Sequence, residues 1–145
     1  MRRLVQLGAA VLLSVSTTAT ADLQVSEAKL RLLPGDLPAA GYFTLTNNGS
    51  QPVVLSGAQS PAFAQVMMHR SSLENGMASM QPIEQLEIPA GATLTFASGG
   101  YHLMLIHRQR ELALGDQVEV NLQFADGQSL PVTLTAALPT ALRRA

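Results

Sequence analysis

Turn-forming residues interrupt this sequence at intervals of about eight to twelve residues, and this spacing limits what the chain can fold into. Between the turns lie short stretches in which apolar and polar residues alternate, as in strands with one buried face. After the first 21 residues, no stretch shows a sustained helical repeat. The pattern therefore predicts an all-β domain, built as a sandwich or a barrel.

Nine stretches have the alternation and the flanking turns expected of strands. They are residues 23–33, 42–46, 52–58, 63–70, 77–83, 92–97, 101–107, 118–124 and 130–136. Asn75-Gly76 favours a two-residue hairpin loop between the fourth and fifth stretches. Asp126-Gly127 predicts a second turn, which makes the last two stretches a closing hairpin.

The N-terminus has the order of a secretory signal peptide. Arg2 and Arg3 precede an apolar run over residues 4–15, and Ala19-Thr20-Ala21 supplies small residues at a cleavage position. The run is too short to span a membrane, and no longer one follows. We therefore expect a signal peptide at 1–21 cleaved after about Ala21, one soluble periplasmic domain at 22–138, and a flexible tail at 139–145.

The chain contains no cysteine. An exported protein of this composition has no disulfide, and it has no thiolate for a structural zinc site, a redox pair or a blue-copper electron-transfer centre. Its few basic residues are scattered, which argues against a nucleic-acid surface. The sequence shows no serine-nucleophile motif and no carboxylate–histidine set typical of a hydrolytic metal site, so we do not expect an enzyme.

Histidine and methionine are confined to one part of the chain. All three histidines and five of the six methionines lie within residues 67–107. Methionine is usually core filler, but imidazole and thioether groups gathered in this way ask for a shared explanation. Thioether sulfur is a soft, neutral ligand that suits copper(I), and imidazole also accepts copper. A set of two imidazoles and two thioethers would hold copper(I) without any thiolate.

The expected hairpin brings two of these residues together. A two-residue loop at Asn75-Gly76 pairs Ser71 directly with Met80. His69 lies on the same face as Ser71, so it becomes a diagonal neighbour of Met80, with about 7–8 Å between the backbones. Long side chains at these two positions could meet around one ion.

A second pair shares one face of another expected strand. His102 and Met104 are two residues apart, so both point to the same side, whereas Leu103 and Leu105 point to the other. The leucines suit the core, and His102 and Met104 are therefore expected to face outward or toward a rim.

The remaining histidines and methionines of this window have explanations that need no metal. Met68 should point into the core, and His107 is expected to be a surface or capping residue at a strand end. Met67 shares a face with His69, which leaves packing and a supporting role near a metal both open. Met77 follows the turn and is expected to be exposed, with a role in copper capture open.

The spacing of four of these residues resembles a known motif. His69 is followed after ten residues by Met80, then after twenty-one by His102 and after one by Met104, as in the PCuAC-type periplasmic copper chaperones. The segments HRSSLENGMASM and IPAGATLTFASGGYHLMLI are similar to that family too. The resemblance runs from about Gly41 through the Asp126-Gly127 turn.

This resemblance implies a fold, a site and partners. The fold would be a single cupredoxin-like β-sandwich of Greek-key type, binding one copper(I) ion through His69, Met80, His102 and Met104. The function would be copper delivery toward the dinuclear copper centre of cytochrome c oxidase, beside a Sco-type thiol protein. A copper storage or resistance protein using the same site is the alternative. A purely structural sandwich would leave the His/Met cluster unexplained.

Overall fold

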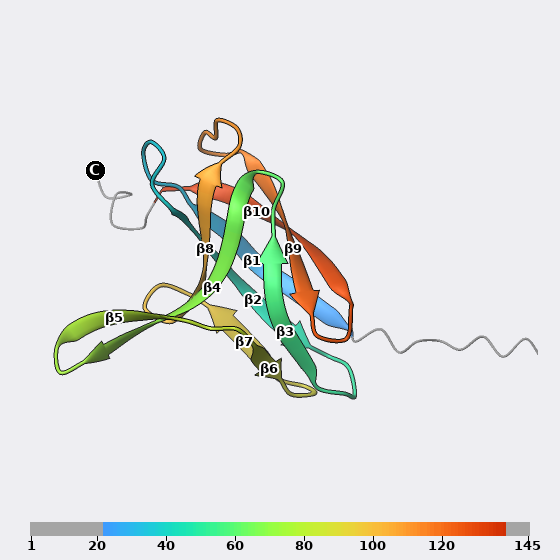
Figure 1. The fold of residues 1–145 in the computed structure, drawn as a ribbon. Coiled ribbons are helices and arrows are strands. Elements are labelled where there is room, and N and C mark those ends of the chain that lie inside the picture. The colour runs from blue at the N-terminus through green and yellow to red at the C-terminus, as the bar shows by residue number, and fades with distance from the viewer. Residues whose placement is uncertain (1–21, 139–145) are drawn as a thin grey trace, which may run out of the picture.

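The computed structural model describes residues 22–138, which fold into ten β-strands without any helix (Figure 1). Accordingly, this part of the chain contains no helix that could cross a membrane. The signal peptide expected at 1–21 and the tail expected at 139–145 lie outside the described residues.

The strands follow the expected stretches closely. In chain order they are β1 (Leu23–Arg31), β2 (Ala39–Asn47), β3 (Val53–Gln59), β4 (Phe63–Glu74), β5 (Met77–Pro82), β6 (Leu86–Ile88), β7 (Thr93–Phe96), β8 (Tyr101–Arg108), β9 (Gln117–Phe124) and β10 (Ser129–Ala137). Strand β6 is not among the expected stretches, because three residues are too few to show alternation. Strand β4 runs past the expected end at Arg70 to Glu74, since its pairing with β5 continues up to the turn.

The strands form one hydrogen-bonded sheet in the order β5-β4-β8-β7-β2-β1-β10-β9-β3-β6. Most neighbours are antiparallel, while β1 pairs with β10, and β7 with β8, in parallel. The sheet curls so that β3, near one end of this order, approaches β4, near the other (Figure 1). The all-β fold predicted from the sequence is therefore confirmed for the described residues.

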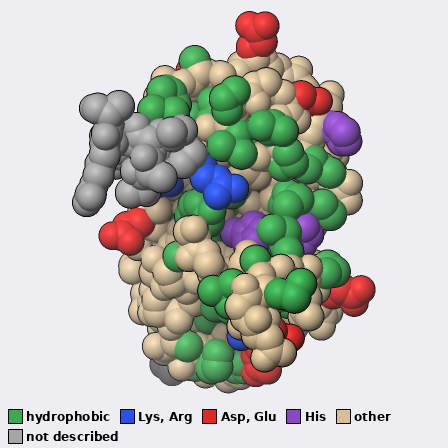
Figure 2. Space-filling model, turned by 90° about the vertical axis from the view of Figure 1, so that its left-hand side faces the viewer, with side chains coloured by type: hydrophobic (Ala, Val, Ile, Leu, Met, Phe, Trp, Pro, Cys, Tyr) green, Lys and Arg blue, Asp and Glu red, His purple; other side chains and the backbone are tan. Residues whose placement is uncertain are grey.

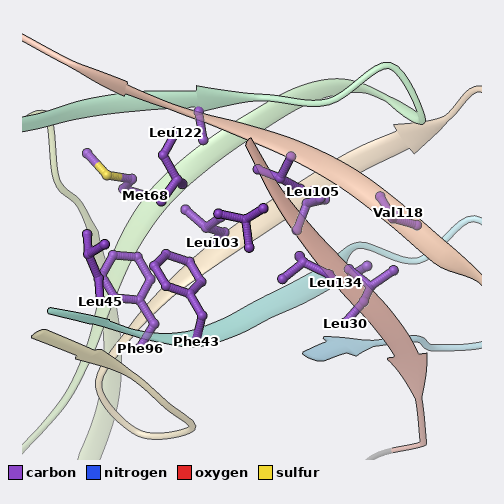
Figure 3. Packing of buried hydrophobic residues seen from close by; sticks show 14 of the residues in the cluster. Leu30, Phe43, Leu45, Met68, Phe96, Leu103, Leu105, Val118, Leu122 and Leu134 are labelled. Atoms are coloured by element: carbon purple, nitrogen blue, oxygen red, sulfur yellow. The ribbon is translucent and has the colours of Figure 1, made fainter. Parts of the chain in front are cut away.

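The core lies inside this curled sheet and consists mainly of aliphatic side chains, with four phenylalanines of which two stack (Figure 3). The rings of Phe43 and Phe96 lie with their centroids 4.5 Å apart. Met68 of β4 and Leu103 and Leu105 of β8 also face this core. Because adjacent residues of a strand point to opposite sides, the residues that flank these three are directed to the outer face of the sheet.

Strands β4 and β5 extend beyond the body of the domain as a two-stranded arm (Figure 1). The pairing of β4 with β8 ends at Arg70, whereas its pairing with β5 continues to Glu74. Asn75 and Gly76 have φ values of 52° and 76°. Positive φ at both central residues is what a two-residue type I′ turn requires, which confirms the hairpin loop expected from the sequence.

Candidate metal centre

His69 and His102 are direct partners across the outer face of the sheet. The register of β4 and β8 sets them opposite one another, as it sets Met68 opposite Leu103 on the core side. The imidazole rings meet edge to face, with centroids 5.7 Å apart and an interplanar angle of 87°. Figure 2 shows histidine side chains gathered among hydrophobic ones on this face. Two imidazoles thus lie within reach of a single ion.

Met80 approaches this pair from the arm. The turn pairs Ser71 with Met80 and His69 with Pro82, so Met80 is the diagonal neighbour of His69 that the hairpin register predicts. The Nδ1 atom of His69 lies 3.2 Å from the Sδ atom of Met80. The Met80 side chain is 50% exposed, so its sulfur is held near the imidazole while remaining open to solvent.

Met104 stands in the next row of the same face. It follows His102 by two residues on β8, and its neighbours across the sheet are Met67 of β4 and Ala40 of β2. Two residues of a strand span about 7 Å, a distance that the long, flexible methionine side chain can shorten toward a shared ion. The structure therefore brings His69, Met80 and His102 into contact and places half-buried Met104 beside them.

His102 departs from the sequence-based expectation in one respect. It lies on the predicted outer face, but its side chain is only 7% exposed rather than at an open rim. The cause is the position of β8, which has β4 on one side and β2 and β7 on the other. Neighbouring strands therefore shield the ring, which local alternation does not reveal.

A backbone carbonyl orients the His102 ring. The Nδ1 atom lies 3.3 Å from the carbonyl oxygen of Gly100, which also accepts a hydrogen bond from the backbone N–H of Ser71, at 3.0 Å. If Nδ1 donates to this oxygen, the Nε2 lone pair is free for a metal. A carbonyl that acts through its backbone leaves no residue-type signal by which this role could have been found.

The environment favours the neutral form of His69. Partial burial lowers its pKa from the ordinary value of 6.5, and a positive charge on the adjacent His102 lowers it further. The neutral ring is the form that coordinates a metal. Within residues 22–138, no three His, Cys, Asp or Glu side chains gather into a group that could hold an ion. The side chain that approaches His69 besides His102 is instead the thioether of Met80.

The structure distinguishes the other histidines and methionines of residues 67–107 by their burial and by the face on which they lie. Met68 is buried in the core, as predicted, and His107 is exposed near the end of β8. Met77 is 74% exposed and lies three positions from Met80, so it belongs to the opposite face of the arm. Met67, by contrast, lies on the same face as His69.

Comparison with known sequences identifies one family. Residues 10–136 match the LpqE-like family model, described as "Putative lipoprotein LpqE-like". A curated relative, "Putative lipoprotein Lxx21020" from Leifsonia xyli subsp. xyli, is 34% identical over 113 residues, which cover 77% of this chain and 68% of the relative.

Solved structures agree in fold. The solution structure of copper(I)-bound DR1885 from Deinococcus radiodurans aligns with a TM-score of 0.64 and 32% identity, covering 83% of this chain and 79% of that one. The copper-bound PCuAC domain from PmoF2 aligns with a TM-score of 0.67 and 22% identity, covering 81% of this chain and 93% of that domain. The chain thus belongs to the LpqE-like family and has the cupredoxin-like β fold of the PCuAC domains, as the resemblance in its sequence predicts.

Proposed function

We propose that this protein binds one copper(I) ion through His69, Met80, His102 and Met104 and carries it to an acceptor protein in the periplasm. The observation that carries this proposal is the convergence of donors from three strands, with the His69 Nδ1 atom 3.2 Å from the Met80 sulfur and the His69 ring against that of His102. The copper-bound forms of DR1885 and of the PmoF2 domain support copper as the ligand.

The donor chemistry selects copper(I). Two imidazoles and two thioethers are neutral, so the complex keeps a single positive charge. Soft sulfur favours copper(I), whereas zinc prefers thiolate, imidazole and carboxylate ligands. The lowered pKa of His69 also favours metal binding, because a larger fraction of the rings is already neutral and needs to lose no proton when the metal binds.

The position of Met80 suits a carrier. His69, His102 and Met104 lie on strands that pair within the body, but Met80 lies on β5, every residue of which is exposed. An incoming ligand can therefore reach the metal from the side of the arm. Displacement of the single Met80 thioether would open one coordination position while three donors still hold the ion.

The acceptor we propose is the dinuclear copper centre of cytochrome c oxidase, with a Sco-type thiol protein acting beside it. Thiolate ligands bind copper(I) more strongly than neutral thioethers do, so transfer in this direction is favourable. Storage or resistance through the same site is the second candidate function. The partly exposed Met80 favours release over retention. The role we assign is non-enzymatic, since the copper is cargo.

Export is part of the proposal. A relative described as a lipoprotein supports a protein that leaves the cytoplasm. The N-terminal signal pattern supports the same route, with cleavage after about Ala21. The intact mass of protein recovered from a periplasmic extract tests it, and a mass that retains residues 1–21 would contradict it.

The decisive experiment combines stoichiometry, ligand identity and transfer. Purified mature protein should bind one equivalent of copper(I), and X-ray absorption should report two nitrogen and two sulfur ligands. Copper-loaded protein mixed with an apo oxidase copper domain should lose its metal to that domain. Retention of copper in the presence of the acceptor would favour storage, and absence of sulfur from the ligand set would contradict the proposed site. The His69→Ala variant, which lacks one of the four proposed donors, should bind copper(I) more weakly.

A further inference from the structure

We propose that Met67 is a fifth metal donor, whose thioether takes over from Met80 when the copper is passed on. The inference rests on the proposed function, because it concerns the same copper(I) site. It assigns to one more residue of the chain a role in holding the ion during transfer.

The strand register places Met67 within the site. Met67 lies directly opposite Met104, just as His69 lies directly opposite His102 one row along. The β carbons of directly opposed residues are about 4.5–5.5 Å apart, so these four side chains form a compact block of two rows on the outer face. The two donors of each row are of the same kind: one row has two imidazoles and the other has two thioethers.

Packing does not account for Met67. Its neighbours Val66 and Met68 both pack against the hydrophobic core, but Met67 is not among the side chains that do so. It is half-buried on the outer face, where a side chain that faces solvent and binds nothing is commonly polar. An apolar, sulfur-bearing side chain beside Met104 is explained if the sulfur has a ligand to bind.

The side chain also has room to move. Met67 borders a hollow of about 260 Å³ between β3 and β4, which is lined in addition by Ser56, Gly57 and Pro82. Unbranched methionine can change rotamer into such a space at little cost. The sulfur can therefore rest away from the ion while Met80 is bound, and turn toward it when Met80 leaves.

The two thioethers differ in what carries them. Met80 lies on β5 and pairs with Ser71, in the part of β4 that no longer pairs with β8. Met67 lies in the part of β4 that does pair with β8. A partner that draws Met80 away from the ion would leave His69, His102 and Met104 with Met67 still on the body. A fourth ligand supplied from within the protein would prevent copper(I) from being lost to solvent before the acceptor binds it.

Copper(I) affinity in a double-mutant cycle tests this inference. Leucine replaces methionine with a similar volume and no sulfur, so Met67→Leu, Met80→Leu and the double variant are compared by competition with a chromophoric copper(I) chelator. We expect a loss of about threefold for Met67→Leu, about tenfold for Met80→Leu, and about a hundredfold or more for the pair, beyond the product of the two. Met77→Leu on the same arm is the matched control and should bind as the unaltered protein does.

A spectroscopic readout separates ligation from packing. With ¹³C-labelled methionine methyl groups, one equivalent of copper(I) should shift the Met67 resonance strongly in Met80→Leu protein and weakly in the unaltered protein. The resonances of Met68 and Met77 should stay in place in both. A Met67 resonance that ignores copper in Met80→Leu protein, together with a double variant equal to the product of the singles, would overturn the inference.

Failure of this inference and failure of the proposed function give different results. If Met80→Leu, Met104→Leu and His69→Ala each weaken copper binding while Met67 has no effect, only the role of Met67 is wrong. If those three variants bind copper(I) as the unaltered protein does, the four-ligand site itself is wrong.

Discussion

The Nδ1 atom of His69 and the sulfur of Met80 lie 3.2 Å apart, although the two residues belong to different strands and eleven positions of chain separate them. The backbone produces this contact, because the Asn75-Gly76 turn fixes which residues of β4 and β5 face each other. Donors held by register should matter more for metal binding than for folding, and this difference can be measured.

Replacement of Met80 by leucine should weaken copper(I) binding by about tenfold or more, because even the loss of a group that only supports a metal ligand commonly costs about 10–100-fold in affinity. The free energy of unfolding should fall by less than about 1 kcal/mol, because half of this side chain is already exposed. Chelator competition measures the first and urea denaturation the second. A large loss of stability with unchanged affinity would show that Met80 is a packing residue.

The two methionines on opposite faces of the sheet should respond oppositely. Met68 is 5% exposed in the core, so Met68→Ala should lower the free energy of unfolding by about 2–5 kcal/mol. Met104 is only half-buried on the outer face, so Met104→Ala should cost less stability but should weaken copper(I) binding. Folded Met68→Ala protein should retain its copper affinity, as chelator competition below its unfolding temperature would show.

Acid should weaken copper binding only at a lower pH than the ordinary pKa of an imidazole would suggest. Burial first, and the charge of His102 second, lower the pKa of His69 below 6.5 in the folded state. The unfolded chain therefore binds more protons between that lowered pKa and 6.5, so the stability due to neutral His69 is complete above pH 6.5 and is lost as pH falls through the folded pKa. Copper(I) affinity should hold to below pH 6.5 and then decline. NMR titration of the His69 ring and affinity measured against pH check both, and His69→Gln should remove the corresponding part of the stability profile.

Oxidation should follow exposure in the metal-free protein and ligation in the loaded one. Met77 and Met80 should form sulfoxides fastest, Met104 more slowly, and buried Met68 slowest. Silver(I), a soft ion that does not itself react with peroxide as copper does, should protect Met80 and Met104 but not Met77. Peptide mapping after matched exposure to peroxide measures this. Equal protection of Met77 and Met80 would point to a general effect of the metal rather than to ligation.

Local patterns were enough to predict the parts of the site that local structure builds. The alternation in residues 101–107 places His102 and Met104 on the face opposite Leu103 and Leu105, and the structure shows that arrangement. The Asn75-Gly76 turn likewise yields the diagonal relation of His69 to Met80.

The pairing of strands that are far apart in the chain could not be predicted from local sequence patterns. Nothing in the residues between β4 and β8 specifies that His69 should face His102, because their register depends on how the whole sheet closes. The same holds for the burial of His102, which comes from the strands on either side of β8, and for the carbonyl of Gly100, whose role depends on position alone. Strand β6 was missed because three residues carry no periodicity.

The two-residue turn of the arm also restricts how this protein can change over evolution. Adding or deleting one residue between Glu74 and Met77 would shift the β4–β5 pairing by one position and turn Met80 away from His69, although the hairpin could still form. The loop between β8 and β9, at residues 109–116, lies outside the strands that carry the donors. Insertions and deletions among descendants of this sequence should therefore accumulate in that loop and be rare in the turn. The ten-residue spacing between His69 and Met80 should be kept, because a change by one residue would put the methionine on the other face of the hairpin.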